Sequence, residues 1–369
     1  MWNNCVQNSH LLKTCMFFIG WKRGLIFGQN QNLARRLCEA PGNVMTPTAF
    51  AQAVVDEVCN CAIMVDVRTK EWMESRKFDA FLMVGKSSCE PPVMVEVMYC
   101  GAPQFDKPII LVGKGTTFDT GGLHLKKESN RTIIDEHRAD MAGAAAIVGA
   151  IKGAAQLSLP INIYGYLPLC ENMISGMAMK PGDGIRSMSG NSILVHDTDF
   201  EGRLGMSDAV TWAQKQYKPR LVLNVGTMTK EVETMLGGGC CAVWSNSKQA
   251  WKQMQKAGAI TGDRVWRFPL WEHYRKSVMA YNSADLSNKG DQEGGEPCLA
   301  AAFLKEFVPC CDWMHMDITG IALPTKSPSH PFYRVGQMTG RPTRTILQFL
   351  YQLACPMSCE QKQQDSCCK

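Results

Sequence analysis

Acidic and basic side chains gather in three short strings of the sequence, each next to a segment with the composition of a strand or a helix. Carboxylates confined to one cleft repel each other and raise each other's pKa unless cations neutralise them. Carboxylate oxygens suit Mg, Mn or Zn, and a bridging Asp and Glu can hold two ions roughly 3.5–4 Å apart, as in co-catalytic hydrolases. The sequence therefore predicts a two-metal site. The strings are Lys114-Gly-Thr-Thr-Phe-Asp119-Thr-Gly-Gly-Leu-His-Leu-Lys126, Arg138-Ala-Asp140-Met-Ala-Gly143-Ala-Ala and Asp197-Thr-Asp199-Phe-Glu201-Gly-Arg203-Leu204.

The elements that must position these strings are typical of an α/β fold, because short apolar runs alternate with helical stretches. Ligands bind at the carboxyl ends of strands in open α/β sheets, so residues that follow different strands can converge on one site. The first string follows one expected strand and the third follows another. We expect core strands at residues 108–113, 161–167, 192–196, 220–225 and 313–318, and helices at residues 32–39, 47–59, 143–157, 204–217 and 297–307.

Local signals mark the ends of several of these elements. Thr46 followed by Pro47 is a plausible helix cap with proline in the first turn, and Pro297 suits the same position in a later helix. Asp140 precedes a run of small residues and is placed to cap the N-terminus of the helix that they form. Ser189-Gly190 predicts a tight turn that joins two strands at residues 184–188 and 192–195.

Composition limits the class of protein. A chain of 369 residues with 45% hydrophobic residues can bury the core of one large domain or two ordinary ones. The formal net charge of +5 is spread without a basic block, so we expect no nucleic-acid partner. No apolar run approaches the roughly 18 residues that span a bilayer, so we expect a soluble, cytoplasmic protein without a membrane partner.

The two ends of the chain carry weaker signals. The apolar stretch at residues 11–21 is a poor secretory signal and leaves a mitochondrial presequence open. The 17 cysteines are scattered or adjacent and never form the paired CxxC spacing of zinc knuckles. We expect them to be small buried hydrophobes in a reducing compartment, with a loosely ordered, cysteine-rich polar tail at residues 355–369.

The three strings resemble the signatures of the leucyl aminopeptidase (cytosol aminopeptidase) family, the third corresponding to the family's hallmark Asn-Thr-Asp-Ala-Glu-Gly-Arg-Leu. The resemblance extends over roughly residues 22–352. It implies a three-layer α/β/α sandwich with a central mixed, largely parallel sheet. It also implies a catalytic domain at residues 29–354. Residues 1–28 then stand as a short remnant where the family usually has a separate N-terminal α/β domain.

The resemblance implies a ligand set for two divalent ions, Mn or Zn. Lys114, Asp119, Asp140 and Glu201 correspond to the residues around the more tightly held ion. Asp119, Asp199 and Glu201 correspond to those around the other, so that Asp119 and Glu201 would bridge both. An amine such as Lys114 can ligate only when it is neutral, which requires that a metal displace its proton.

The resemblance also implies the catalytic roles. Lys126 would stay protonated and polarise the scissile carbonyl, and Arg203 would hold a bicarbonate ion that serves as the general base. The residues expected to bind substrate are Lys126, Asp140, Thr227 and Met228. The implied reaction is the release of N-terminal amino acids from peptides by attack of a metal-activated water.

Some positions depart from the family pattern. Lys230 stands where the family has Gly, His137 replaces an apolar residue, Asp197 replaces Asn and Phe200 replaces Ala. About three extra residues lie between the first two strings, in the loop at residues 127–137. The resemblance places these positions in or near the substrate pockets, so leucine preference does not follow from it, and Lys230 would repel nearby cations.

Two functions are consistent with the sequence. The first is an active metal-dependent aminopeptidase, which acts on peptides and forms a homo-oligomer, hexameric in the family. The alternative is a catalytically weakened paralogue with a structural or interaction role. An assay on amino-acid amides with added metal and with a chelator separates the two.

Overall fold

The computed structural model describes residues 2–59, 61–126, 137–324 and 333–355, with side chains from residue 20 onward. Most of the loop expected to carry the extra residues, and the tail from residue 356, lie outside this part. The helices are α1 (Trp2–Glu39), α2 (Pro47–Val58), α3 (Lys70–Ser75), α4 (Asp79–Gly85), α6 (Ala142–Gln156), α7 (Glu201–Gln216), α8 (Lys230–Leu236), α9 (Lys248–Thr261), α10 (Glu272–Val278), α11 (Glu296–Lys305) and α12 (Thr343–Ala354).

The strands form one large sheet and one small sheet. The path through the large sheet is β1-β2-β5-β3-β8-β12-β9-β10, with β4 paired to β5, and the small sheet has the order β11-β7-β6. The strands are β1 (Ile63–Arg68), β2 (Val93–Cys100), β3 (Ile109–Gly113), β4 (Gly115–Asp119), β5 (Asn162–Asn172), β6 (Gly184–Arg186), β7 (Ser192–Leu194), β8 (Leu221–Gly226), β9 (Cys241–Ser245), β10 (Val265–Arg267), β11 (Leu286–Ser287) and β12 (Asp312–Asp317).

The centre of the large sheet is parallel. β3 pairs in parallel with both β5 and β8, and β8 pairs in parallel with β12. The pairs β1–β2, β2–β5 and β12–β9 are antiparallel. The sheet is therefore mixed and largely parallel. Because the central strands run the same way, their carboxyl ends meet at one edge of the sheet.

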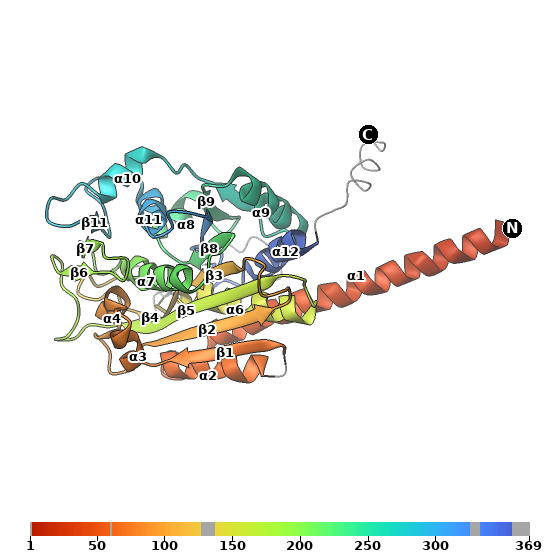
Figure 1. Cartoon of the computed structure of the whole chain (residues 1–369), viewed down its shortest axis with the longest axis horizontal. Coiled ribbons are helices and arrows are strands. Elements are labelled where there is room, and N and C mark those ends of the chain that lie inside the picture. The colour runs from red at the N-terminus through yellow and green to blue at the C-terminus, as the bar shows by residue number, and fades with distance from the viewer. Residues whose placement is uncertain (1, 60, 127–136, 325–332, 356–369) are drawn as a thin grey trace.

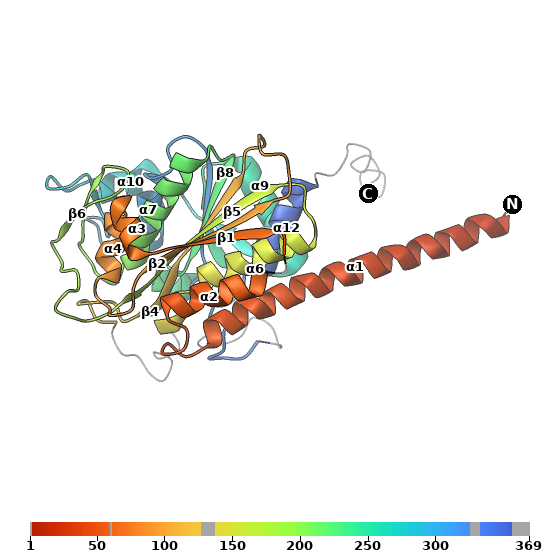
Figure 2. The ribbon, with the colours of Figure 1, turned by 60° about the horizontal axis from the view of Figure 1, so that its bottom comes forward.

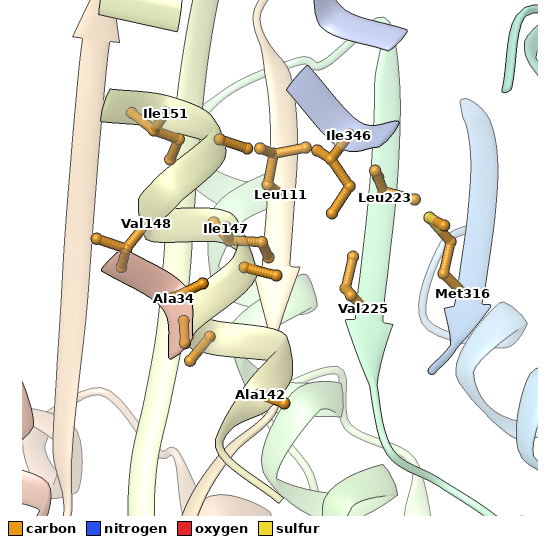
Figure 3. Close-up of a cluster of buried hydrophobic side chains, with 14 of the residues drawn as sticks. Ala34, Leu111, Ala142, Ile147, Val148, Ile151, Leu223, Val225, Met316 and Ile346 are labelled. Carbon is orange, nitrogen blue, oxygen red and sulfur yellow. The ribbon is translucent and has the colours of Figure 1, made fainter. Parts of the chain in front are cut away.

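Helices cover both faces of the sheet, as alternation along the strands requires. In β3, Ile109 and Leu111 belong to one buried cluster, and Ile110 and Val112 belong to the other. The first cluster packs against α1, α2, α6, α9 and α12, and the second packs against α4, α7 and α11 (Figures 1 and 2). Figure 3 shows Leu111 of the first cluster beside helical side chains of α6 and α12. The expected three-layer α/β/α sandwich is confirmed.

The expected core strands at residues 108–113, 161–167, 220–225 and 313–318 correspond to β3, β5, β8 and β12. The expectation for residues 192–196 was wrong in its placement. This segment forms β7, which lies in the small sheet and not in the central one. It pairs antiparallel with β6, and Gly190 takes a φ of 97° in the turn between them, so the predicted turn is confirmed.

Most of the helix signals are confirmed. Thr46 Oγ1 accepts a hydrogen bond from Ala49 N, with Pro47 in the first turn, and Pro297 lies in the first turn of α11. Asp140 is an exception, since Met141 directly precedes α6 and no side chain caps that end. The carboxylate of Asp140 instead faces two lysine ammonium groups, whose full charges attract it more strongly than helix N–H groups do.

α1 is longer than the expected helix at residues 32–39. It spans 38 residues, and its N-terminal part extends away from the body of the molecule (Figure 1). Residue 28, where the sequence places the end of a remnant, lies inside this helix. The domain division stays a prediction. Among the described residues, no helix is both long and apolar enough to cross a membrane.

Gly143 permits the close approach of α6 to β8. A Cβ atom at this position would lie 2.2 Å from the carbonyl oxygen of Val225. We expect Gly143→Ala to lower the free energy of unfolding by about 1–3 kcal/mol, because backbone must shift to admit the methyl group. Urea unfolding followed by circular dichroism measures the change.

The control is Gly28→Ala in α1, where a Cβ atom would meet nothing within 4 Å. Alanine is the better helix former by about 1 kcal/mol, so this variant should be as stable as the parent or more stable. If Gly143→Ala were as stable as Gly28→Ala, the close packing of α6 on β8 would be wrong.

Candidate metal centre and substrate cavity

The predicted site lies at the carboxyl edge of the parallel strands. Lys114 follows β3 directly, Asp119 ends β4, and Thr227 follows β8. Glu201 is the first residue of α7, so this helix brings the third string to the same edge. A cavity of about 730 Å³ opens here, and its wall includes Lys114, Asp119 and Thr227. One edge of the sheet thus collects residues from all three strings.

Three carboxylates form the centre of the site. Asp119, Asp140 and Glu201 are buried, and each offers one oxygen so that the three atoms lie within 4.8 Å of one another. Lys114 Nζ lies 2.8 Å from Glu201 Oε1 and 3.2 Å from Asp140 Oδ1. Lys126 Nζ lies 2.7 Å from Asp119 Oδ2 and 2.8 Å from Asp140 Oδ2. The structure therefore interleaves two ammonium groups with the carboxylates.

Two further residues hold these carboxylates in place. Asn172, at the end of β5, donates a hydrogen bond from Nδ2 to Asp119 Oδ1 at 2.8 Å. Thr116 Oγ1 donates to Glu201 Oε1 at 2.9 Å. Neither residue was predicted from the sequence to belong to the site. Both lie in segments that resemble the family, but an amide or hydroxyl in a strand carries no signal of its own until a partner faces it.

Asp199 lies at the side of this cluster. Its Oδ1 is 3.8 Å from Lys126 Nζ, and its side chain is one third exposed. Burial raises the pKa of Asp199 to about 7, and burial together with repulsion from Glu201 raises the pKa of Asp119 to about 7. The site thus disfavours full ionisation of its acids when only Lys114 and Lys126 balance them.

The lysines respond in the opposite sense. Burial alone would lower the pKa of Lys114, but attraction to Asp140, Glu201 and Asp119 raises it above its ordinary value. The pKa of Lys126 is raised in the same way, chiefly by Asp119 and Asp140. Burial alone would raise the pKa of Asp140, yet the two ammonium groups hold it well below its usual range. The centre is a place of strong attraction for cations.

The donor set fits divalent metal ions. Glu201 Oε2 and Asp199 Oδ1 are buried and have no hydrogen-bond partner, and buried carboxylate oxygens in native proteins normally have one. Four carboxylates face two ammonium groups, which leaves negative charge in excess in a buried place. Oxygen ligands of this kind suit Mg, Mn or Zn. The residues that could supply such ligands are Asp119, Asp140, Asp199 and Glu201.

The other predicted site residues divide into two groups. Thr227 and Met228 line the cavity, and the backbone oxygen of Thr227 accepts a hydrogen bond from Lys114 Nζ at 2.9 Å. Arg203 is 1% exposed and does not line the cavity. Its Nη1 donates to the backbone oxygen of Asn288, and the ring centroid of Phe200 lies 4.2 Å from its Cζ.

The positions that depart from the family pattern all lie on the cavity wall: His137, Asp197, Phe200 and Lys230. His137 packs edge-on against Phe118, with ring centroids 5.1 Å apart. Asp197 Oδ1 lies 2.8 Å from His124 Nδ1. Lys230 is exposed and begins α8. The residues that the resemblance assigns to the metal ions are thus all present, while the cavity wall around them carries residues that differ from the family pattern.

Fold and site together define an α/β domain with a buried, carboxylate-rich centre whose donor set fits divalent metal ions. The model of the cytosol aminopeptidase family, catalytic domain, matches residues 32–347. The chain belongs to this family. The resemblance of the three strings is thereby confirmed.

Curated relatives support the same family. The chain is 46% identical over 337 residues to a cytosol aminopeptidase of Bos taurus, and 46% identical over 333 residues to that of Homo sapiens. These alignments cover 90% and 89% of the chain, but only 64% and 63% of the relatives. The chain thus spans less than two thirds of their length.

Solved structures show the same fold. The bottromycin maturation enzyme BotP, in a structure described as a complex with Mn, superposes with a TM-score of 0.82 at 32% sequence identity. The match covers 90% of this chain and 72% of BotP. The fold that the sequence predicted is therefore shared with this solved structure.

Proposed function

We propose that the chain is a two-metal-dependent aminopeptidase that releases N-terminal amino acids from peptides. The observation that carries this proposal is the buried cluster of Asp119, Asp140 and Glu201 beside a cavity of about 730 Å³, whose wall includes Asp119 and Asp140. Membership of the cytosol aminopeptidase family supports it. The bound metal of BotP supports a metal at the equivalent centre, with Mn or Zn as the candidates here.

In this proposal Lys114, Asp119, Asp140 and Glu201 would hold one ion, and Asp119, Asp199 and Glu201 would hold the other. When bound, the ions lower the pKa of a water so that it attacks the peptide carbonyl at neutral pH. The carboxylates fix the positions of the ions because hydrogen bonds from neighbouring side chains and backbone orient them.

Lys126 supplies a positive charge beside the proposed metal ions. Its ammonium stays protonated because Asp119 and Asp140 raise its pKa, and its side chain lines the cavity while remaining 24% exposed. From this position it donates a hydrogen bond to the oxygen on which negative charge develops during attack. Thr227 and Met228 form the adjacent wall and position the substrate backbone. A bound metal would offer a coordination position to a free N-terminal amine, and this would favour peptide ends over internal peptide bonds as substrates.

The test is hydrolysis of leucyl-, arginyl- and methionyl-amide reporters by the purified chain, with added Mn or Zn and with a chelator. We expect turnover that depends on the metal and stops with the chelator. Elemental analysis of the same samples measures bound metal. Bound metal without turnover on any reporter would favour the alternative of a weakened paralogue, and neither metal nor turnover would refute the proposal.

The proposal also includes the cellular compartment, the substrates and the oligomeric state of the chain. Relatives named cytosol aminopeptidases suggest the cytosol as the compartment. Peptides are the proposed substrates, and a homo-oligomer stays a prediction that size-exclusion chromatography with light scattering tests.

Lys230 is expected to restrict the choice of N-terminal residue. It lies on the cavity wall and adds a positive charge near the proposed metal ions. We expect Lys230→Gly to raise kcat/KM for neutral N-terminal residues roughly 10-fold, the scale of a pocket mismatch. Lys230→Gln keeps the approximate length of the side chain and removes its charge. A comparison of the two variants therefore separates the effect of the charge from the effect of side-chain size. An unchanged or lower rate with both variants would show that Lys230 does not face the substrate.

A further inference from the structure

Arg203 is buried, does not line the cavity and already has hydrogen-bond partners. Its Nη1 donates to the backbone oxygen of Asn288, and its Nη2 donates to the backbone oxygen of Glu296 at 3.4 Å. These carbonyls lie beside β11 and at the start of α11, so Arg203 connects the first turn of α7 to both. The guanidinium thus acts as a link between segments of the fold.

Phe200 separates this guanidinium from the cavity. The ring lies on the cavity wall, whereas Arg203 does not, and its centroid is 4.2 Å from Arg203 Cζ. This is the distance of a close cation–π contact. Lys289 Nζ lies 6.0 Å from the same ring centroid. Two cations therefore hold the ring, and the ring covers a face of the arginine.

A planar oxyanion such as bicarbonate binds arginine best through two parallel N–H···O bonds. In this chain one N–H of each Nη already donates to a backbone carbonyl, so the guanidinium keeps three N–H groups, and the Nε–H among them is buried without a partner. Access limits an anion more than the number of donors does, because Arg203 is buried and does not line the cavity. An anion that entered from the cavity would have to move the Phe200 ring. With Phe200 in this position, the site does not fit a bound bicarbonate.

We propose that Phe200 is a cover that keeps small oxyanions away from Arg203, so that this chain works without the bicarbonate that the family resemblance implies. Arg203 then serves as a positioning residue that holds α7, and with it Glu201, against the segment at Asn288. The statement on catalysis rests on the proposed aminopeptidase function. The statement on anion exclusion does not.

The first experiment measures binding of bicarbonate directly. Isothermal titration calorimetry is run at fixed pH and ionic strength on the metal-loaded protein, with chloride as the reference anion, for the parent and for Phe200→Ala. We expect no saturable binding to the parent and saturable binding to the variant. Phe200→Leu, which keeps apolar bulk but has no aromatic face, is the second variant in case the alanine variant does not fold.

A double variant locates the bound anion. Arg203→Met in the Phe200→Ala background should abolish the gained binding if the anion sits on the guanidinium, while binding to the metal ions alone would survive. Equal binding by the parent and Phe200→Ala would overturn the proposal. So would the absence of binding by both Phe200 variants, because removal of the cover would then expose no site.

The second experiment concerns turnover. In buffers freed of carbon dioxide, added bicarbonate should leave kcat/KM of the parent unchanged and raise that of Phe200→Ala. A bicarbonate-dependent rise in the parent would contradict the proposal. If neither protein cleaves any reporter, the aminopeptidase function fails, and the calorimetry alone still decides whether Phe200 covers Arg203.

Discussion

Replacement of Glu201 by glutamine is expected to lower kcat/KM by roughly 10³-fold or more, because the proposed site loses a carboxylate that bridges both ions. The side chain is 1% exposed, and its Oε1 already pairs with Lys114 Nζ at 2.8 Å. Its second oxygen is the buried atom without a hydrogen-bond partner. Glutamine keeps the shape and can still accept from Thr116, so the fold should survive.

Three measurements check this result on one preparation: kcat/KM with an amino-acid amide, bound metal by elemental analysis, and thermal unfolding. The matched control is Glu96→Gln. Glu96 is also a buried glutamate of the sheet region, but it pairs with Arg68 and accepts from Trp212 Nε1, and it does not belong to the carboxylate cluster. Its metal content should match the parent. If Glu201→Gln bound the same metal and turned over normally, Glu201 would not be a ligand.

Removal of the Asp263 carboxylate is expected to produce the largest loss of stability. Asp263 Oδ1 lies 2.8 Å from Arg341 Nε, and both side chains are at most 2% exposed. Arg344 Nη2 lies 3.4 Å from the same oxygen. The pair ties the start of α12 to the segment between α9 and β10. Asp263→Ala would remove the carboxylate that faces the buried guanidinium of Arg341, and breaking such a pair costs about 3–5 kcal/mol.

Urea unfolding at neutral pH measures this loss, with Arg36→Ala as the control. Arg36 also pairs with a carboxylate, Glu57, at 2.7 Å, but its side chain is 62% exposed. Exposed pairs of this kind contribute roughly 0–1 kcal/mol, because water screens them. A loss for Asp263→Ala as small as that for Arg36→Ala would mean that solvent reaches the guanidinium of Arg341.

Much of the site was predictable because its residues lie in contiguous strings. Lys114, Asp119 and Lys126 fall within one string, and Asp199 and Glu201 are two positions apart. Their order along the chain, and the apolar segments beside them, can be recognised in the sequence without knowledge of the packing. The central strands were predictable for a related reason, since buried parallel strands read as short apolar runs.

Edge and accessory elements gave weaker signals. β7 has the composition of a core strand, yet it joins a separate small sheet, because strand pairing depends on partners that are distant along the chain. Asp140 was expected to cap α6, but Lys114 and Lys126 face its carboxylate in the fold. The local sequence around Asp140 does not show that the fold brings two ammonium groups to its carboxylate, so it could not predict that they replace the helix cap.

The sequence by itself determined the class of fold, the family and the identity of the residues that could hold metal, since these depend on residue types and local periodicity. Only the tertiary structure decided which neighbours complete the site. It places Asn172 within a hydrogen bond of Asp119, and Thr116 within a hydrogen bond of Glu201. It also places the Phe200 ring in a cation–π contact with Arg203. Such contacts join side chains through space, and their strength depends on distance and burial that no string of residues specifies.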